Sequence, residues 1–161
     1  MMSKSFKISA VAALLIAAAP ASNWSLEKKS DPITDARKVT LTLKQRPNLL
    51  LLQCDSSDAQ PFSITVGKEG AFLGGPPILR LTVVRFNEAQ PIEQQWGYSS
   101  YFAVAQELQR ETITSIGRSK VLVLRLQDRN RTPVDLVFNL TGAATQIAGF
   151  KKACASLGMS F

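Results

Sequence analysis

Two cysteines, Cys54 and Cys154, constrain the fold of this chain more than any other feature of its sequence. They are its only cysteines, and 100 residues separate them. In an oxidising compartment, two thiols without a third usually form one disulfide. A redox pair or a reactive thiol is the alternative, but the chain has no Cys-x-x-Cys motif. We therefore expect a structural disulfide that stabilises the fold by roughly 4–5 kcal/mol in the chain-entropy model.

The first 21 residues predict export. Lys4 and Lys7 precede an apolar run from Ile8 to Ala19, and an Ala-Pro-Ala sequence ends at Ala21. This pattern is typical of a secretory signal peptide cleaved after Ala21. A membrane anchor is the alternative, but a spanning helix needs about 20 apolar residues, more than this run supplies. We expect a periplasmic protein with one domain, residues 22–161, and no transmembrane segment after cleavage.

The charge balance of the mature chain is mildly basic. Loss of Lys4 and Lys7 lowers the formal net charge from +7 to +5. This balance permits contact with phospholipid, peptidoglycan or another anionic surface, although we favour a solvated surface as its meaning. The basic residues are scattered and lack interleaved aromatic residues, so nucleic acid is not an expected partner.

Hydrophobic periodicity predicts an α+β fold. Alternating or continuous apolar residues indicate strands at 37–44, 49–54, 62–66, 78–86, 92–98, 121–127 and 134–140. A period of three to four residues indicates helices at 100–117 and 141–157. Cys154 lies on the apolar stripe of the second helix, and Cys54 ends the second strand. We expect a mainly antiparallel sheet or sandwich, with the C-terminal helix packed on it and held by the disulfide.

The sequence offers little for catalysis. It contains no histidine, which excludes Ser-His-Asp and Cys-His arrangements and the usual zinc sites. Neither a P-loop nor a nucleophile-elbow motif is present, so we expect no enzyme activity, no metal and no cofactor. Asp31 and Asp35 precede the first predicted strand, where they form a turn, contact a ligand or cation, or act as paired carboxylates.

Several side chains within the predicted strands are candidates for binding. Arg85 continues the series Leu79, Leu81 and Val83, which we expect to face inward, so a bulge redirects it or it is buried. A buried arginine needs an acid or a carbonyl partner, and an ion pair is favoured over a ligand. Arg80, Arg85 and Arg125 could instead point to solvent from the outer face of the sheet. Trp24 and Trp96 are either core residues or binding anchors.

The order of these features resembles a known family. Trp24 and the segment DPITDARKVTLTL are followed by LLLLQC, by VVRF, by Trp96, by the hairpin VLVLRLQDRNRTPVDLVFNL and by the helix LTGAATQIAGFKKAC. From Trp24 to Cys154, the chain resembles the VasI/TagO-type periplasmic accessory proteins of type VI secretion and related exported proteobacterial proteins. The chain has Arg85-Phe86-Asn87 where that family has Arg-aromatic-Asp. The resemblance implies a role associated with secretion and carries over no catalytic residue.

Three functional hypotheses follow. The first is a non-enzymatic envelope protein that binds another envelope component through an exposed strand edge or its basic surface. The second is a periplasmic inhibitor or immunity-type protein directed against a cell-wall hydrolase. The third is a hydrolase that acts on peptidoglycan through two carboxylates among Asp31, Asp35, Asp55 and Asp58.

Overall fold

The computed structural model describes residues 23–74 and 78–161, so the predicted signal peptide at 1–21 lies outside the described residues. The strands are β1 (Trp24–Ser30), β2 (Arg37–Gln45), β3 (Asn48–Asp55), β4 (Phe62–Lys68), β5 (Ile78–Phe86), β6 (Ile92–Tyr98), β7 (Phe102–Ala105), β8 (Val121–Gln127) and β9 (Pro133–Asn139). The helices are α1 (Gln109–Arg118) and α2 (Ala143–Ala155). Among the described residues, no helix is long and apolar enough to cross a bilayer.

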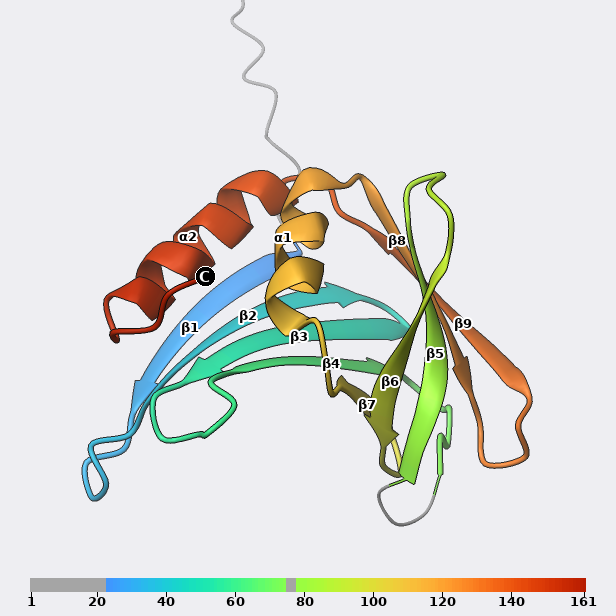
Figure 1. Ribbon diagram of the computed structural model, residues 1–161, viewed down its shortest axis with the longest axis horizontal. Coiled ribbons are helices and arrows are strands. Elements are labelled where there is room, and N and C mark those ends of the chain that lie inside the picture. The colour runs from blue at the N-terminus through green and yellow to red at the C-terminus, as the bar shows by residue number, and fades with distance from the viewer. Residues whose placement is uncertain (1–22, 75–77) are drawn as a thin grey trace, which may run out of the picture.

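All nine strands belong to one sheet with the order β1-β2-β3-β4-β7-β6-β5-β8-β9, and every pairing is antiparallel. The sheet is strongly bent, so that β5, β6, β8 and β9 cross the direction of β1 to β4 (Figure 1). Both helices lie on its inner face, with α1 against β4 and α2 against β2 and β1 (Figure 1). The prediction of an α+β fold built on an antiparallel sheet is confirmed.

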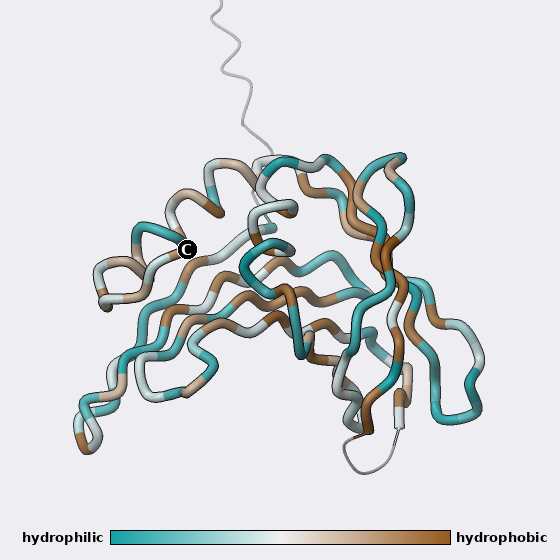
Figure 2. Tube along the Cα trace, viewed as in Figure 1, coloured by the Kyte–Doolittle hydropathy of each residue, from teal (hydrophilic) through white to brown (hydrophobic). Residues whose placement is uncertain are grey.

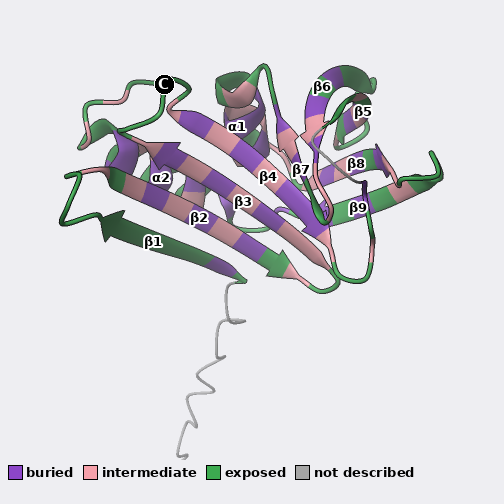
Figure 3. Ribbon diagram, turned by 90° about the horizontal axis from the view of Figure 1, so that it is seen from below, coloured by how far each residue is buried: buried purple, intermediate pink, exposed green. Residues whose placement is uncertain are grey.

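The core fills the space between the bent sheet and the helices. Leu41, Leu50 and Ile64 on β2, β3 and β4 are at most 1% exposed and point to this side. Buried and partly exposed residues alternate along the strands, as the purple and pink bands of Figure 3 show. The same alternation is visible as hydropathy in Figure 2. Because successive strand residues point to opposite faces, the predicted alternation of β2, with Val39, Leu41 and Leu43 on one face, is confirmed.

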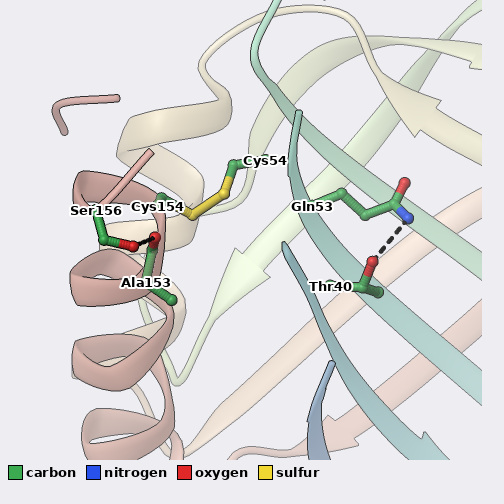
Figure 4. Close-up of a disulfide and its surroundings, with 6 residues drawn as sticks. All are labelled: Thr40, Gln53, Cys54, Ala153, Cys154 and Ser156. Carbon is green, nitrogen blue, oxygen red and sulfur yellow. Dashed lines mark hydrogen bonds between the residues drawn. A yellow bond between two sulfur atoms is a disulfide. The ribbon is translucent and has the colours of Figure 1, made fainter. Parts of the chain in front are cut away.

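The disulfide joins the C-terminal helix to the sheet, as predicted. Cys54 on β3 and Cys154 on α2 are bonded, with an S–S distance of 2.07 Å, and both residues are fully buried (Figure 4). The predicted stripe on α2 is also buried, including Ile147 and Phe150. The disulfide therefore anchors the C-terminal helix on the sheet.

The helix predicted at 100–117 begins later than expected. Phe102–Ala105 forms β7, which pairs with β4 on one side and β6 on the other, and the helix starts at Gln109. Among the described residues, β7 is the strand whose pairing joins β1–β4 to the other half of the sheet, so strand pairing outweighs the helical spacing of its apolar residues.

The bend also brings the outer edge strand β9 against the ends of β2, β3 and β4. Gln45 exchanges hydrogen bonds with the backbone N–H and carbonyl of Asn139. Asn48 donates from Nδ2 to the Val137 carbonyl at 3.0 Å, and Lys68 donates from Nζ to the Asp135 carbonyl at 3.2 Å. Side chains thus occupy backbone groups of β9 that no neighbouring strand pairs.

Candidate functional site

Trp96 lies in the core. It is fully buried on β6, and its indole Nε1 donates to Gln94 Oε1 at 3.2 Å. Gln94 in turn donates from Nε2 to Thr112 Oγ1 on α1 at 3.1 Å. This buried network ties the sheet to α1, so Trp96 presents no surface to a partner.

Arg85 is exposed on the outer face of the sheet, and the expectation that it continues an inward-facing series is wrong. Leu79 and Leu81 are 63% and 55% exposed, whereas Thr82 and Val84 are fully buried. The residues of β5 that face the core are therefore the other alternating set, which includes Thr82 and Val84. Within the described ranges, Arg85 makes no ion pair, and the solvent-facing alternative holds for it.

The polar residues on the inner face of β5 find partners there. Thr82 Oγ1 lies 2.7 Å from the Tyr98 hydroxyl oxygen, and burial raises the pKa of that hydroxyl. Arg80 donates to the backbone carbonyls of Gln127 and Asp128, and its guanidinium carbon lies 5.4 Å from the centroid of the Tyr98 ring. Because Thr82, Tyr98 and Arg80 are all hydrogen-bonded, their polar groups can lie on the inner face of the sheet.

Arg125 is engaged in a salt bridge on the outer face. Its Nε and Nη2 donate to the two carboxylate oxygens of Asp135 at 2.7 and 2.8 Å. The hydrogen bonds from Arg125 hold the pKa of the Asp135 carboxyl below its usual value. This two-point contact between β8 and β9 uses the charge that Arg125 could otherwise offer to a ligand.

Asp31 and Asp35 lie in the exposed turn between β1 and β2. Asp31 Oδ1 accepts from the backbone N–H of Ile33 at 2.8 Å, which lowers the pKa of Asp31. Asp35 adopts a left-handed conformation with φ 55°. These are the features of a backbone turn, as the structural interpretation predicts.

Asp55 lies beside this turn. Asp31 and Asp55 line the same shallow depression, together with Lys38. Hydrogen bonds from Ser57, and then contact with Lys38 Nζ at 3.2 Å, lower the pKa of Asp55. In the part of the chain that the structure describes, no group of three or more metal-ligating side chains comes together.

A groove lies at the other end of the sheet. It encloses about 410 Å³ and is formed by the β2–β3 turn, the end of β4 and the start of β7. Its floor is a row of outer-face residues that the strand register places side by side: Lys44 pairs with Leu49, Leu49 with Gly67, and Gly67 with Phe102. We call this site the β4–β7 groove.

Gly67 shapes the floor of the β4–β7 groove. A Cβ atom at this position would lie 2.9 Å from Phe102 Cδ1 and 3.0 Å from the Tyr101 carbonyl oxygen. The Phe102 ring therefore lies directly over Gly67. A larger residue at position 67 would leave no room for this ring. The result is a flat apolar floor next to an aromatic wall.

Exposed aromatic rings form one side of the groove. Tyr101 and Phe102 are 58% and 41% exposed. The Tyr101 ring meets Phe72 edge to face at 5.7 Å between centroids, and the Arg129 guanidinium carbon lies 5.9 Å from the Phe72 centroid. Packing against Phe72 restricts Tyr101, which lowers the entropy lost when a ligand contacts this ring.

Cations also line the groove. Lys44, Arg46 and Lys68 line it, while Glu69 is its only acid. Within residues 23–74 and 78–161, none of these three cations is in an ion pair. Asn48 also lines the groove, and its Oδ1 is a buried oxygen without a hydrogen-bond partner among the described residues. The groove thus combines a positive wall with an aromatic wall.

The two edges of the sheet are less suited to binding a partner strand. Side chains from β2, β3 and β4 occupy backbone groups of β9. The other edge, β1, carries Glu27, Lys28 and Lys29, and charged residues on an edge discourage strand addition. Of the two modes of binding expected from the sequence, the structure favours a basic surface over a strand edge.

Comparison of the chain with protein-family models, with curated proteins and with solved structures finds no match. The candidate site therefore rests on geometry. Sequence reasoning missed the groove because it placed Phe102 on the buried stripe of a helix. The adjacent aromatic residues Tyr101 and Phe102, followed by a short alternating segment, are the signal that could have indicated it.

Proposed function

We propose that this chain is a non-enzymatic envelope protein that binds another envelope component through the β4–β7 groove. The observation that carries the proposal is the pairing of exposed aromatic rings with three cations that form no salt bridge among the described residues. Aromatic residues and arginine are enriched where proteins bind one another, and they supply much of the binding energy there.

The candidate carboxylates also fit a binding protein better than a hydrolase. A carboxylate hydrolase needs one acid with a raised pKa to protonate the leaving group. The pKa values of Asp31 and Asp55 are instead lowered by their hydrogen bonds. Both carboxylates are therefore ionised at neutral pH and suited to turn formation and to ion pairing.

The proposed setting is the periplasm. The signal-like sequence at 1–21 and the disulfide between Cys54 and Cys154 support export to an oxidising compartment. The resemblance to VasI/TagO-type proteins supports a role as a type VI secretion accessory factor. The partner would then be a protein of that apparatus or of the surrounding envelope.

Photo-crosslinking in living cells tests this proposal. A photo-reactive amino acid is placed at Tyr101 in the groove and, as a control, at Ile33, which is 91% exposed in the β1–β2 turn. We expect a discrete adduct with an envelope protein from Tyr101 only. The adduct should disappear when Lys44→Glu and Arg46→Glu are added, since these changes reverse the charge of the groove.

Equal crosslinking from the two positions, or none from Tyr101, would refute binding through the groove. An adduct in which a single cell-wall hydrolase is joined to this chain at one-to-one ratio would replace the accessory role by the inhibitor role.

A further inference from the structure

We propose that the β4–β7 groove binds an extended acidic segment of a partner protein, in which an acidic residue and a large apolar residue are four positions apart. This inference rests on the proposed function and names the chemistry of the ligand. It follows from the charge, the hydrogen-bonding capacity and the dimensions of the groove.

The charge of the groove selects an anion. Lys44, Arg46 and Lys68 outnumber Glu69 by three to one, which leaves a local charge of +2. Asp135 lies close enough to Lys68 for the two charges to interact, but its carboxylate is held by Arg125 through two hydrogen bonds. Among the described residues, Lys44 and Arg46 form no salt bridge and are available to a ligand, whereas Lys68 Nζ also donates to the Asp135 carbonyl.

The hydrogen-bonding groups of the groove select carboxylates over a hydroxyl-rich glycan. Lysine and arginine side chains only donate, whereas sugar hydroxyls need both donors and acceptors. The neutral amide in the groove belongs to Asn48, whose Nδ2 is committed to the Val137 carbonyl and whose Oδ1 is buried. Glu69 and the hydroxyl of Tyr101 are the exposed side-chain acceptors of the groove, and the Tyr101 hydroxyl can also donate. The donors of Lys44, Arg46 and Lys68 outnumber these acceptors, which suits a ligand whose polar groups are anionic acceptors.

The shape of the groove selects a chain segment over a membrane surface. A bilayer is flat on the scale of a 410 Å³ concavity, so lipid headgroups would meet the rim and leave the floor empty. Leu49, Gly67 and Phe102 give this floor an apolar character. A side chain projecting from a polypeptide can reach it, and its burial there would contribute to affinity.

The dimensions of the floor set the spacing of the ligand. From Lys44 to Phe102 the row crosses three gaps between neighbouring strands, about 14 Å at about 4.8 Å per gap. An extended segment rises about 3.3 Å per residue, so residues four apart are about 13 Å apart and point to the same side. An acid near Lys44 therefore places an apolar residue, four positions along, at the β7 end of the row, next to the Phe102 ring that covers Gly67.

The test measures binding of fluorescent hexapeptides to the oxidised protein by anisotropy. The probe is acetyl-Glu-Glu-Ser-Thr-Ser-Phe-amide, in which the second Glu and the Phe are four positions apart. One control peptide replaces both Glu by Gln, and another moves Phe next to the acids without changing the composition. We expect both controls to bind at least about tenfold more weakly, because each loses one half of the two-part contact.

Protein variants separate the groove from general electrostatics. Lys44→Glu with Arg46→Glu should weaken binding of the probe at least about tenfold. Lys28→Glu with Lys29→Glu on β1 changes the net charge equally and should leave the affinity within about twofold. Each variant is first checked for an unchanged circular dichroism spectrum and cooperative thermal unfolding. All four residues are exposed, so folding should be retained.

The aromatic wall is tested with a second matched pair. Tyr101→Ser should weaken binding of the probe several-fold, whereas Leu79→Ser, which removes a similarly exposed residue elsewhere on the sheet, should have no effect. The proposed ligand is overturned if the three peptides bind equally, if the probe does not bind, or if both charge-reversed proteins bind it equally.

Vesicles of phosphatidylglycerol provide the membrane arm of the test. Binding of the protein to vesicles that survives Tyr101→Ser, together with no binding of the probe, would overturn the peptide ligand in favour of an anionic bilayer. Crosslinking from Tyr101 in cells without binding of the probe would leave the proposed function intact and reject only this ligand class. Failure of both experiments would reject the groove as a binding site.

Discussion

Reduction of the disulfide should remove a large part of the stability of this protein. Cys54 and Cys154 close a loop of 100 residues, and the chain-entropy model assigns about 4.7 kcal/mol to a loop of that length. A folded domain of about 140 residues has an unfolding entropy near 0.29 kcal/mol/K, so this loss corresponds to a fall in Tm of about 16 °C. Since whole domains are stable by about 5–15 kcal/mol, the reduced protein should be only marginally folded.

The measurement is urea unfolding of the oxidised and the reduced protein, followed by tryptophan fluorescence. Trp24 and Trp96 are buried, so their emission should shift when the core opens. The variant Cys54→Ala with Cys154→Ala should be insensitive to reductant. It should also be less stable than the reduced wild type, because two fully buried side chains become smaller. A reduced protein within about 1 kcal/mol of the oxidised form would refute the argument from loop length.

Three further predictions concern single residues. Gly67→Val should destabilise the fold by about 1–3 kcal/mol in thermal unfolding, because the valine side chain would overlap the Phe102 ring. As a control, Gly149→Ala on α2 should be neutral or stabilising, because an added Cβ there has no atom within 4 Å. The salt bridge to Arg125 lowers the pKa of Asp135 in the folded state. Its contribution to the free energy of unfolding is therefore complete above the pKa of Asp135 in the unfolded chain, near 4, and is lost as the pH falls through the lowered pKa of the folded state. The urea midpoints of Asp135→Asn and wild type should therefore differ at pH 7 and converge below pH 3; a constant difference would contradict this. Gln94→Ala should cost about 2–4 kcal/mol in urea unfolding, since it leaves two buried polar partners unpaired, and a loss below 0.5 kcal/mol would show that they find other partners.

The strands with one strictly apolar face were predictable from the sequence. Along β2 and β3, alternate residues such as Leu41 and Leu52 face the core and their neighbours face outward. The apolar stripe of α2 placed Cys154 on a buried face, and the disulfide followed from the absence of any other cysteine. In these elements, the local pattern and the tertiary structure agree.

The face of β5 was not predictable in the same way. Apolar residues occupy both faces of this strand, and its outer face carries the more prominent leucines, Leu79 and Leu81. The inner face includes Arg80 and Thr82, which the core accepts because Tyr98 and backbone carbonyls supply partners. These partners are distant in sequence, so hydrophobic alternation alone selects the wrong face.

Strands β1 and β7 also escaped prediction. The residues of β1 are exposed after Trp24, because it is an edge strand, and they show no apolar alternation. β7 has only four residues and contains two alanines, which fit the crowded centre of the sheet but have little strand propensity. Their positions depend on the pairing of neighbouring strands.

The candidate site depends on long-range register. Lys44, Gly67 and Phe102 become neighbours only when β2, β3, β4 and β7 pair in a particular alignment. The sequence identified the carboxylates of the β1–β2 turn as candidates because they are close along the chain. It could not identify a groove whose walls come from three separate segments.

The single disulfide has a consequence for how this protein is made. With two cysteines, one chain has only one possible intramolecular pairing, so no incorrect isomer can form within it. The thiol of Cys54 is synthesised 100 residues before its partner, and during that interval its only wrong partners are cysteines of other molecules. Biogenesis should therefore require a thiol oxidase but no disulfide isomerase, and its yield should depend on how crowded the newly made chains are.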